Sequence, residues 1–313
     1  MNDLLGSLFA LLVFPGLAFL STCALAFDWL DRRVIARMQG RVGPPWFQPL
    51  ADLIKLLAKE DILPTGANET VAAVLPMVSL ASVLTAALYV PVGGRVAASF
   101  EGDLIVVLFL LSIPALAYFL AGWVTVGVYS VLGGNRSLLQ YFSYEVPFLM
   151  ALSTPAILNS SWSIAEISAR QLTWGLFTLP LGFILALVGL IGKLKRDPLD
   201  IPKAKSEVVA GALTEFSGRK LALWHLAMSM QTVVGIFLLV NLFLGGSKAI
   251  FLAVPPPLAP VIFGLKALTI LVLLSTFSVL YARLRIDQLA RLGWRVLAPL
   301  ALVQILVTVW MGG

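Results

Sequence analysis

Four ionisable residues lie in or beside long apolar stretches of this 313-residue sequence. Glu145 stands in the segment SYEVPF, and Lys266 lies within the apolar run 257–282. Glu207 and Glu215 flank the modestly apolar segment VVAGALT. A charged side chain at the centre of a membrane costs ~2.5–3.5 kcal/mol on insertion scales, so ionisable residues there usually face a cavity or a partner. We therefore predict that these four residues form an internal relay for protons or other ions.

Each of these residues also has a purely structural explanation. Glu145 could be stabilised by the dipole at the start of a helix, and Lys266 could belong to a structural ion pair. Glu207 and Glu215 could face water in a loop. His225, the only histidine of the chain, could be a polar contact rather than a proton shuttle.

The chain has too few ligands to hold a redox metal. Its only cysteine is Cys23 and its only histidine is His225, whereas iron–sulfur clusters, zinc sites and disulfides each need more than one such residue. The sequence contains no nucleophile elbow, phosphate-binding glycine loop or zinc motif. We therefore expect no catalytic residue, metal site or bound cofactor in this chain, and any redox metal to lie in another subunit.

The composition excludes a soluble enzyme. Hydrophobic residues make up 59% of the chain and charged residues 12%, with a mean hydropathy of +0.96, whereas soluble domains have roughly 45–50% and about 25%. The net charge of +6 is explained by basic residues in cytoplasmic loops, so we do not expect nucleic acid as a partner. The sequence predicts an all-α, polytopic membrane protein whose residues 1–313 form a single transmembrane domain.

We expect eight transmembrane helices, of which the fourth is the shortest and carries Glu145 and Pro147. They are residues 4–27, 71–92, 104–130, 145–158, 173–191, 221–244, 257–282 and 292–311. The first run lacks a basic start and a cleavage site, so it is expected to be a retained helix and not a signal peptide. The cytoplasmic loops are then 28–70, 131–144, 192–220 and 283–291, with short amphipathic helices in them.

Basic residues gather on one side of this eight-helix topology. Most of the 22 Lys and Arg residues fall in the four cytoplasmic loops, whereas the opposite loops contain Arg95, Arg170 and Lys248. Lys and Arg are concentrated in cytoplasmic loops of membrane proteins. We therefore expect a multi-pass protein of the plasma membrane, surrounded by lipid, with both termini outside the cytoplasm.

Two of the cytoplasmic loops have features of their own. In the first loop, the segment QPLADLIKLLAKED repeats apolar residues at i, i+3, i+4 and i+7 from Leu50, which predicts a short amphipathic helix at the membrane interface or against a partner. The segment Arg41–Pro45 contains a glycine and two prolines that fix a particular loop shape. Pro198 and Pro202 prevent a continuous helix over 193–220.

The sequence resembles the complex I subunit 1 family (the H subunit of NADH-quinone oxidoreductase) in four segments that occur in family order and spacing: DRRVIARMQGRVGPPWFQPLADLIKLLAKE, AGWVTVGVYSVLGGNRSLLQYFSYEV, DPLDIPKAKSEVVAGALTEFSG and YARLRIDQLARLGW. In that family this subunit is an eight-helix membrane protein that contacts the hydrophilic arm. In the quinone-reducing branch it lines the quinone tunnel and carries a chain of glutamates into the membrane. The resemblance places Glu145, Glu207 and Glu215 on that chain. It places Lys266 on the family lysine of the seventh helix.

The resemblance also assigns residues to the cavity loop, the tunnel mouth and the arm interface. They are Arg32, Arg41, Gly43, Pro44, Pro45, Asp52, Lys55, Glu60, Arg136 and Asp200. It implies two kinds of partner, cluster-bearing subunits of a peripheral arm and antiporter-like membrane subunits. Iron–sulfur clusters, and in a hydrogenase nickel–iron, would be held by these partners.

Several positions depart from the quinone-reducing branch. Lys193, Lys203, Lys205 and Met228 stand where that branch usually has acidic residues, and RVGPP lacks its asparagine after the first proline. A lysine side chain has an ordinary pKa near 10.4 and stays charged unless strongly desolvated, so these changes make the cytoplasmic funnel basic. The pattern is more similar to energy-converting membrane-bound nickel–iron hydrogenases and sulfane sulfur reductases. We therefore expect the membrane anchor and coupling subunit of a ferredoxin-linked complex that couples electron transfer to H⁺ or Na⁺ translocation.

Three alternatives stay open. The chain could be the quinone-tunnel subunit of an NADH- or F420H2-type quinone oxidoreductase, the closest rival within the family. It could be a stand-alone secondary transporter, although that function predicts inverted repeats with paired broken helices, and the sequence has no clear internal repeat. It could also be a structural scaffold whose buried carboxylates affect stability alone.

Overall fold

The computed structural model describes residues 2–171, 173–249 and 255–312, and these residues are helical apart from their connections and one isolated β-bridge between Val92 and Arg95. The α-helices are α1 (Asn2–Leu12), α2 (Leu17–Met38), α3 (Gln48–Ala58), α4 (Glu69–Tyr89), α5 (Asp103–Val124), α6 (Val128–Asn159), α7 (Ile164–Arg170), α8 (Gly175–Thr178), α9 (Pro180–Leu194), α10 (Lys205–Val208), α11 (Gly218–Phe243), α12 (Ala259–Leu280), α13 (Ile286–Leu292) and α14 (Ala298–Gly312). Short 3₁₀ segments cover Ile201–Lys203, Gly211–Leu213 and Pro256–Leu258, and a π-helical segment covers Gly293–Leu297.

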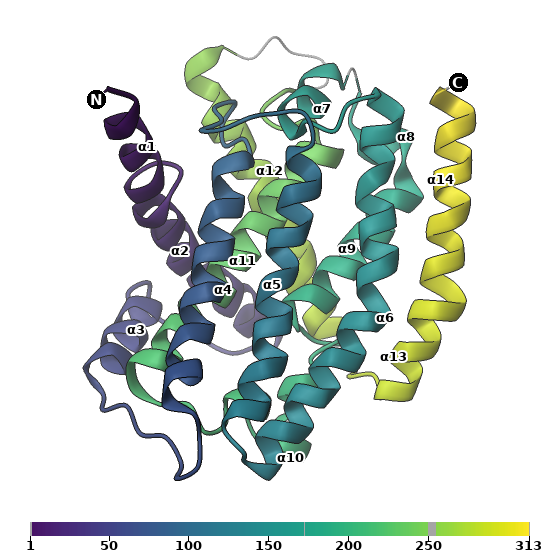
Figure 1. Ribbon diagram of the computed structural model, residues 1–313. Coiled ribbons are helices and arrows are strands. Elements are labelled where there is room, and N and C mark those ends of the chain that lie inside the picture. Colours follow the sequence, from purple (N-terminus) through teal and green to yellow (C-terminus); the bar gives the residue numbers. More distant parts are fainter. Residues whose placement is uncertain (1, 172, 250–254, 313) are drawn as a thin grey trace.

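The long helices form one bundle around α11 (Figure 1). Every residue of α11 from Met230 to Phe243 is buried, and this helix packs against α2, α3, α4, α9 and α12. The helices α3, α10 and α13 lie at one end of the bundle, at the bottom of Figure 1, and α7 and α8 lie at the other. We call the first of these the basic end, because the segments around Arg196, Lys203 and Arg283 belong to it.

The structure confirms the all-α class but supports fewer spans than expected. Six helices of the described chain are long and apolar enough to cross a membrane: Leu8–Met38, Glu69–Tyr89, Asp103–Val124, Gly218–Phe243, Pro256–Leu280 and Ile286–Met311. The apolar helix α9 is shorter. The 32 residues of α6 give about 48 Å of rise, more than the ~30 Å of a membrane core, but Arg136 and Glu145 make it less apolar.

A tight turn joins α5 to α6. The apolar run 104–130 divides at residues 125–127, where Val126 adopts the left-handed φ of 58°. A Cβ on Gly122 would lie 2.4 Å from the carbonyl oxygen of Ser130. Glycine at this position therefore allows α6 to return in close contact with α5.

The helix that carries Glu145 begins earlier than the sequence predicts. Residues 131–144, expected as a cytoplasmic loop, form the first half of α6. A Cβ on Gly133 would lie 2.4 Å from Cα of Gly211, so this half packs tightly on the segment that follows α10. Gln140 donates hydrogen bonds of 2.8 and 2.7 Å to two carbonyl groups of residues 192–199. The Gln140 amide nitrogen, part of the polarity that indicated a loop, is thus satisfied within the protein, whereas the side-chain oxygens of Ser137, Gln140 and Tyr144 are buried without a hydrogen-bond partner among the described residues.

Two other expected loops also contain helix. The charged start of 28–70 continues α2 as far as Met38, and α13 occupies most of 283–291. The predicted amphipathic helix is confirmed as α3. Leu50 and Ile54 on its apolar face are 44% and 57% exposed, so this face is available to lipid or to a partner.

Candidate functional site

A buried ion pair joins α6 to α9. Nζ of Lys193 lies 2.7 Å from Oε1 and 2.8 Å from Oε2 of Glu145, and the two side chains are 1% and 5% exposed. Ser112 of α5 donates a hydrogen bond to the same carboxylate. The rings of Tyr144 and Phe148 flank the ammonium group at 5.9 and 5.1 Å. Groups from three helices therefore enclose the pair.

Glycines on α9 provide the space for this pair. A Cβ on Gly189 would lie 2.5 Å from the Phe148 side chain, and a Cβ on Gly192 would lie 2.9 Å from the Tyr144 ring. Because larger residues would push α6 away, these glycines allow the close approach of the two helices. Lys193 follows Gly192 directly and meets Glu145 across the contact.

The enclosed pair is costly to break and chemically versatile. Removal of one partner of a buried pair leaves an uncompensated charge and typically costs about 3–5 kcal/mol. Transfer of a proton from the ammonium to the carboxylate would convert the ionic pair into a neutral one without changing the net charge. Such a pair can respond to a change in the local electric field, which is what a proton or charge relay requires.

Two further lysines lie beside this pair toward the basic end. Nζ of the buried Lys195 is 4.4 Å from the centre of the Tyr118 ring. Nζ of the half-buried Lys203 is 6.0 Å from the same ring and 3.1 Å from Sδ of Met228. Neither lysine forms an ion pair within the part of the chain that the structure describes. Desolvation, then repulsion by Lys203 and Lys193, lowers the pKa of Lys195 from 10.5 to about 7. Desolvation likewise lowers the pKa of Lys203 to about 8.

A cavity of about 270 Å³ opens between α2, α3 and α11. Its lining consists of Leu25, Asp28, Arg32, Pro49, Asp52, Leu53, Lys55, Leu56, His225, Leu226 and Ser229. Arg32 joins two of its walls, at 2.8 Å from Asp28 on α2 and 3.0 Å from Asp52 on α3. Desolvation opposes ionisation of Asp52, but hydrogen bonds from Arg32 and Gln48 outweigh it, so the pKa of Asp52 is lowered.

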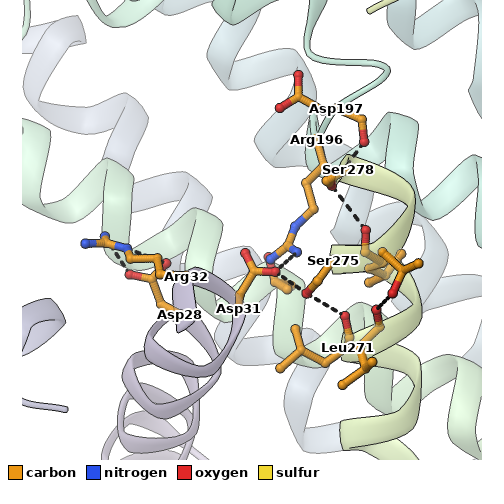
Figure 2. A network of polar contacts seen from close by, with 12 residues as sticks. Asp28, Asp31, Arg32, Arg196, Asp197, Leu271, Ser275 and Ser278 are labelled. Atoms are coloured by element: carbon orange, nitrogen blue, oxygen red, sulfur yellow. Dashed lines mark hydrogen bonds and ion pairs between the residues drawn. The ribbon is translucent and has the colours of Figure 1, made fainter. Parts of the chain in front are cut away.

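A second polar network ties α2 to α12 and to the segment that follows α9 (Figure 2). Asp31 accepts hydrogen bonds from Arg196 at 2.9 Å and from Ser275 at 2.6 Å. Ser278 donates to the backbone carbonyl of Asp197 at 3.1 Å. Figure 2 shows Arg196 reaching toward Asp31 of α2. Arg32, the next residue of α2, points in the opposite direction, toward Asp28. The charges of α2 therefore serve two separate clusters.

The structure places Glu207 and Glu215 apart from the buried pair. Glu207 of α10 forms an ion pair with Arg136 of α6, and the Glu207 side chain is 53% exposed. Glu215 is half-buried beside the α5–α6 turn, where its Oε1 would lie 2.7 Å from a Cβ on Gly127. Both carboxylates belong to the basic end, one at the surface and one beneath it.

Lys266 lies at the opposite end of the bundle. Its ammonium group donates hydrogen bonds to the backbone carbonyls of Leu244, Gly246 and Lys248, and it lies 4.9 Å from the Trp174 ring. These carbonyls follow the carboxyl end of α11, where unpaired carbonyls attract cations. Lys266 of α12 is therefore in a different polar cluster from the buried ion pair.

The predicted cavity loop has a defined shape. Nε1 of Trp29 donates a hydrogen bond of 3.2 Å to the carbonyl of Pro44, and the guanidinium of Arg33 lies 5.2 Å over the Trp29 ring. A Cβ on Gly43 would lie 3.0 Å from Cα of Arg33, so a larger residue would displace the loop. Val42, which directly precedes Gly43 in this loop, is 97% exposed.

The remaining predicted interface residues also lie at the basic end. Asp200 accepts two hydrogen bonds from Arg283 and thereby raises the pKa of that guanidinium. The exposed Glu60 accepts a hydrogen bond at its backbone carbonyl from Ser217, which precedes α11. Arg41 is bonded to Gln39 within its own loop. This end of the molecule therefore presents a charged surface whose loops are held to the bundle.

Sequence reasoning missed part of this site. It identified Lys193 only as a basic replacement, and it did not single out Lys195, Asp31 or Arg196. The position of Lys193 directly after the apolar, glycine-containing stretch PLGFILALVGLIG is a signal that could have indicated burial. Asp31 and Arg196 carried no local signal, because 165 positions separate them.

The polar clusters do not have the composition of a metal site. Among the described residues, no group of three or more His, Cys, Asp and Glu side chains could hold a metal ion. The clusters consist of carboxylates paired with ammonium or guanidinium groups. Such pairs are suited to balancing and moving charge.

Comparisons with known proteins converge on one family. A family model described as NADH dehydrogenase matches residues 10–309. The H subunit of NADH-quinone oxidoreductase from Bacillus cytotoxicus is 35% identical over 308 residues, which cover 95% of this chain and 91% of that protein. The protein of the same name from Dehalococcoides mccartyi is 34% identical over 298 residues, covering 93% and 83%. A solved structure of the membrane-bound sulfane sulfur reductase, an archaeal respiratory membrane complex, contains a chain that matches with a TM-score of 0.86 and 25% identity. The match covers 98% of this chain and 100% of that one.

Proposed function

The chain belongs to the NADH dehydrogenase family as a membrane subunit of the complex I type, and we propose that it is the membrane anchor and coupling subunit of a ferredoxin-linked respiratory complex. In this role it seats a peripheral redox arm and links electron transfer in that arm to ion translocation in the membrane. The observation that carries the proposal is the Glu145–Lys193 pair, enclosed by α5, α6 and α9. A change of charge in the arm would shift the proton within this pair.

The proposal includes an eight-span topology in the plasma membrane. In this topology the six long apolar helices cross the membrane, and α6 and α9 provide the other two crossings. The helices α6 and α9 pack against each other within the bundle. The basic end would face the cytoplasm, since Lys and Arg concentrate in cytoplasmic loops. Both termini would then lie outside.

The basic end would seat the arm. The exposed apolar residues Val42, Trp46 and Ile54 lie close in sequence to the charged residues Arg32 and Lys55, and such a mixture of apolar anchors and peripheral charges is typical of protein interfaces. Partner subunits of the arm would hold the iron–sulfur clusters, and antiporter-like subunits would share the membrane. This chain would contribute surface and charge, not a cofactor.

The relay would use the predicted carboxylates in different ways. Glu145 would be the relay group at membrane depth, and Glu207 and Glu215 would collect protons at the basic end. Lys266 would set the charge at the opposite end, where it lies against the carbonyls that follow α11.

Lysines at relay positions favour the ferredoxin-linked branch. By the resemblance, Lys193 and Lys203 stand where the quinone-reducing branch usually has acidic residues, and in this structure Lys193 faces Glu145. The structural match to the sulfane sulfur reductase chain supports the same branch. The terminal acceptor would then be protons or a sulfur species.

The cavity favours a second candidate, a quinone-tunnel subunit. Its volume of about 270 Å³, its apolar walls and the polar side chains of Arg32 and His225 would suit an aromatic, hydrogen-bonding ligand. The relatives that are 34% and 35% identical are named for quinone reduction. Under this function the cavity would bind the quinone headgroup.

The native complex, purified through a tag on this chain, tests the proposal. Ferredoxin oxidation with protons or sulfur compounds as acceptors is compared with quinone reduction, and nickel and iron are quantified. Ferredoxin-linked turnover is expected, whereas quinone reduction alone would support the second candidate. Transport by the isolated chain in liposomes, without partner subunits, would instead indicate a secondary transporter.

The variant Glu145→Gln tests coupling in that complex. We expect assembly and electron transfer to persist while ion transport is lost, because glutamine can accept a hydrogen bond from Lys193 but cannot carry the proton. The exposed Glu101 provides the matched control Glu101→Gln, which should behave like the wild type. Wild-type transport by Glu145→Gln would remove this residue from the mechanism, and a loss of stability with intact coupling would support a scaffold.

A further inference from the structure

A pocket of about 390 Å³ opens between α2, α11 and α12, at the end of the bundle opposite the basic end. Its walls are largely aromatic. Phe27 of α2 and Phe263 of α12 lie edge to face against Phe237 of α11, with ring centres 6.1 and 5.0 Å from that ring. Phe19 lines the pocket eight positions before Phe27 on α2, so the pocket extends about 12 Å along this helix.

A tight turn places Arg95 at the mouth of this pocket. Val92 and Arg95 exchange backbone hydrogen bonds of 2.8 and 3.0 Å around Gly93 and Gly94, whose φ angles are 61° and 84°. A two-residue turn of this kind requires positive φ at both central positions, which glycine adopts without strain. A Cβ on Gly93 would lie 3.2 Å from Pro260. The turn therefore rests on the start of α12, and Arg95 contributes to the lining of the pocket.

Arg95 has no counter-ion within the described chain. Its side chain is exposed and forms no ion pair or hydrogen bond with the described residues. Other basic residues of this end are engaged, since Arg170 pairs with Glu166 at 2.9 Å and Lys248 donates to a backbone carbonyl. The ammonium group of Lys266 is bound by three carbonyls. Arg95 is therefore available to bind an anion.

The aromatic walls are suited to a hydrocarbon chain. Apolar cavities exclude water, and an empty cavity deprives its lining of dispersion contacts. A helix is about 10–12 Å across, whereas α2 and α12 pack against each other beside the pocket, so an acyl chain fits there better than a helix of another subunit. Since lipid tails are as apolar as the pocket, the tail alone does not select one lipid, and selection falls to the charge at the mouth.

We propose that this pocket binds an anionic phospholipid, with one acyl chain among the phenylalanine rings and the headgroup phosphate on Arg95. A guanidinium group binds phosphate oxygens through two parallel N–H donors. One lipid can reach both parts, because Arg95 lines the same pocket that extends along α2 to Phe27. The bound lipid would hold α2 and α12 together against α11. The site shares no residue with the proposed relay or arm interface, so it stands or falls independently of them.

Photo-cross-linking in the assembled complex tests the headgroup contact. The complex is placed in phosphatidylcholine vesicles with a small share of phosphatidylglycerol, or of phosphatidylcholine, that carries a photoactivatable group on one acyl chain. Peptides that contain residues 14–27 and 260–264 should be labelled about fivefold more by phosphatidylglycerol, the preference that one basic residue typically gives for anionic lipid. Arg95→Gln should remove this preference. The matched control Arg170→Gln, at the same end but in the lining of a different pocket, should keep it.

A second variant acts on the acyl chain. A Cβ on Gly264, which lines the pocket, would have nothing within 4 Å. A leucine there fits without a clash and occupies the place of the tail, so Gly264→Leu should abolish labelling of these peptides by either lipid. Gly6→Leu is the matched control, because a Cβ on Gly6 also has nothing within 4 Å and this residue lies outside the pocket lining.

Each outcome decides the inference. Equal labelling of the wild type by the two lipids would overturn it, as would an unchanged preference in Arg95→Gln. Labelling that appears only after other subunits are removed would show that a neighbouring subunit covers the pocket, which is equally contrary. Wild-type labelling of Gly264→Leu would place the tail outside the pocket. If Gly264→Leu does not assemble, Arg95→Gln alone is decisive, because its exposed side chain has no partner to lose among the described residues.

Discussion

Replacing Lys193 with methionine should leave Glu145 as an unpaired carboxylate inside the bundle. The ammonium and carboxylate lie 2.7 Å apart with 1% and 5% of their side chains exposed. At an effective dielectric constant of about 20 this separation corresponds to about 6 kcal/mol of attraction. Part of that attraction offsets desolvation, and loss of one partner costs about 3–5 kcal/mol.

Thermal stability of the purified complex measures this cost. At about 2–4 °C per kcal/mol, Lys193→Met should lower the unfolding midpoint of this subunit by about 6–20 °C. The double variant Lys193→Met with Glu145→Gln should lose less than the two single variants together, with a coupling energy of at least about 2 kcal/mol. Arg170→Met is the control, because its side chain is 50% exposed beside Glu166, at the end of the bundle opposite the basic end, and such surface pairs contribute at most about 1 kcal/mol. Additive losses in the double variant would refute the idea that the pair acts as a unit.

Three other predictions follow from the same geometry. Gly189→Ala should destabilise the complex by about 1–3 kcal/mol, because its Cβ would lie 2.5 Å from the Phe148 side chain. The control Gly264→Ala should not, because a Cβ there would have nothing within 4 Å. Equal thermal unfolding midpoints of the two variants would contradict the close contact of α6 and α9. The pKa of Lys195 is about 7 in the folded protein, against the ordinary value of 10.5. Between these two pH values the unfolded chain binds more protons than the folded one, so the free energy of unfolding should rise with pH across that window. A rise of equal slope in Lys195→Met would exclude Lys195 as its source. Lys266→Met should cost about 1–3 kcal/mol by leaving buried carbonyls unpaired, and an unchanged midpoint would show that these carbonyls find other partners.

Features that depend on neighbouring residues were predictable from the sequence. Apolar runs and composition indicated an all-helical membrane protein, and the spacing of apolar residues from Leu50 predicted α3. The quoted segments indicated the family, which the comparisons confirm. Each of these signals is contained within a few turns of chain.

Features that depend on distant contacts were not predictable. Residues 131–144 look like a loop because they are polar, yet they form helix because residues 192–213 shelter their polar side. The partner of Glu145 lies 48 positions away, and the glycines that admit it, such as Gly189, look like ordinary apolar sequence. Charge alone placed Lys193 at the surface, whereas tertiary packing encloses it.

The uncovered apolar stripe of α3 has a consequence for biogenesis. Leu50, Ile54 and Leu57 are each more than two-fifths exposed, and Val42 in the preceding loop is almost fully so. A newly made chain that has inserted but met no other subunit would offer this stripe to any apolar surface nearby. Binding of a partner subunit over this stripe, as proposed above, would therefore protect the chain from self-association and proteolysis, and overproduction of this chain alone should yield aggregated or degraded material.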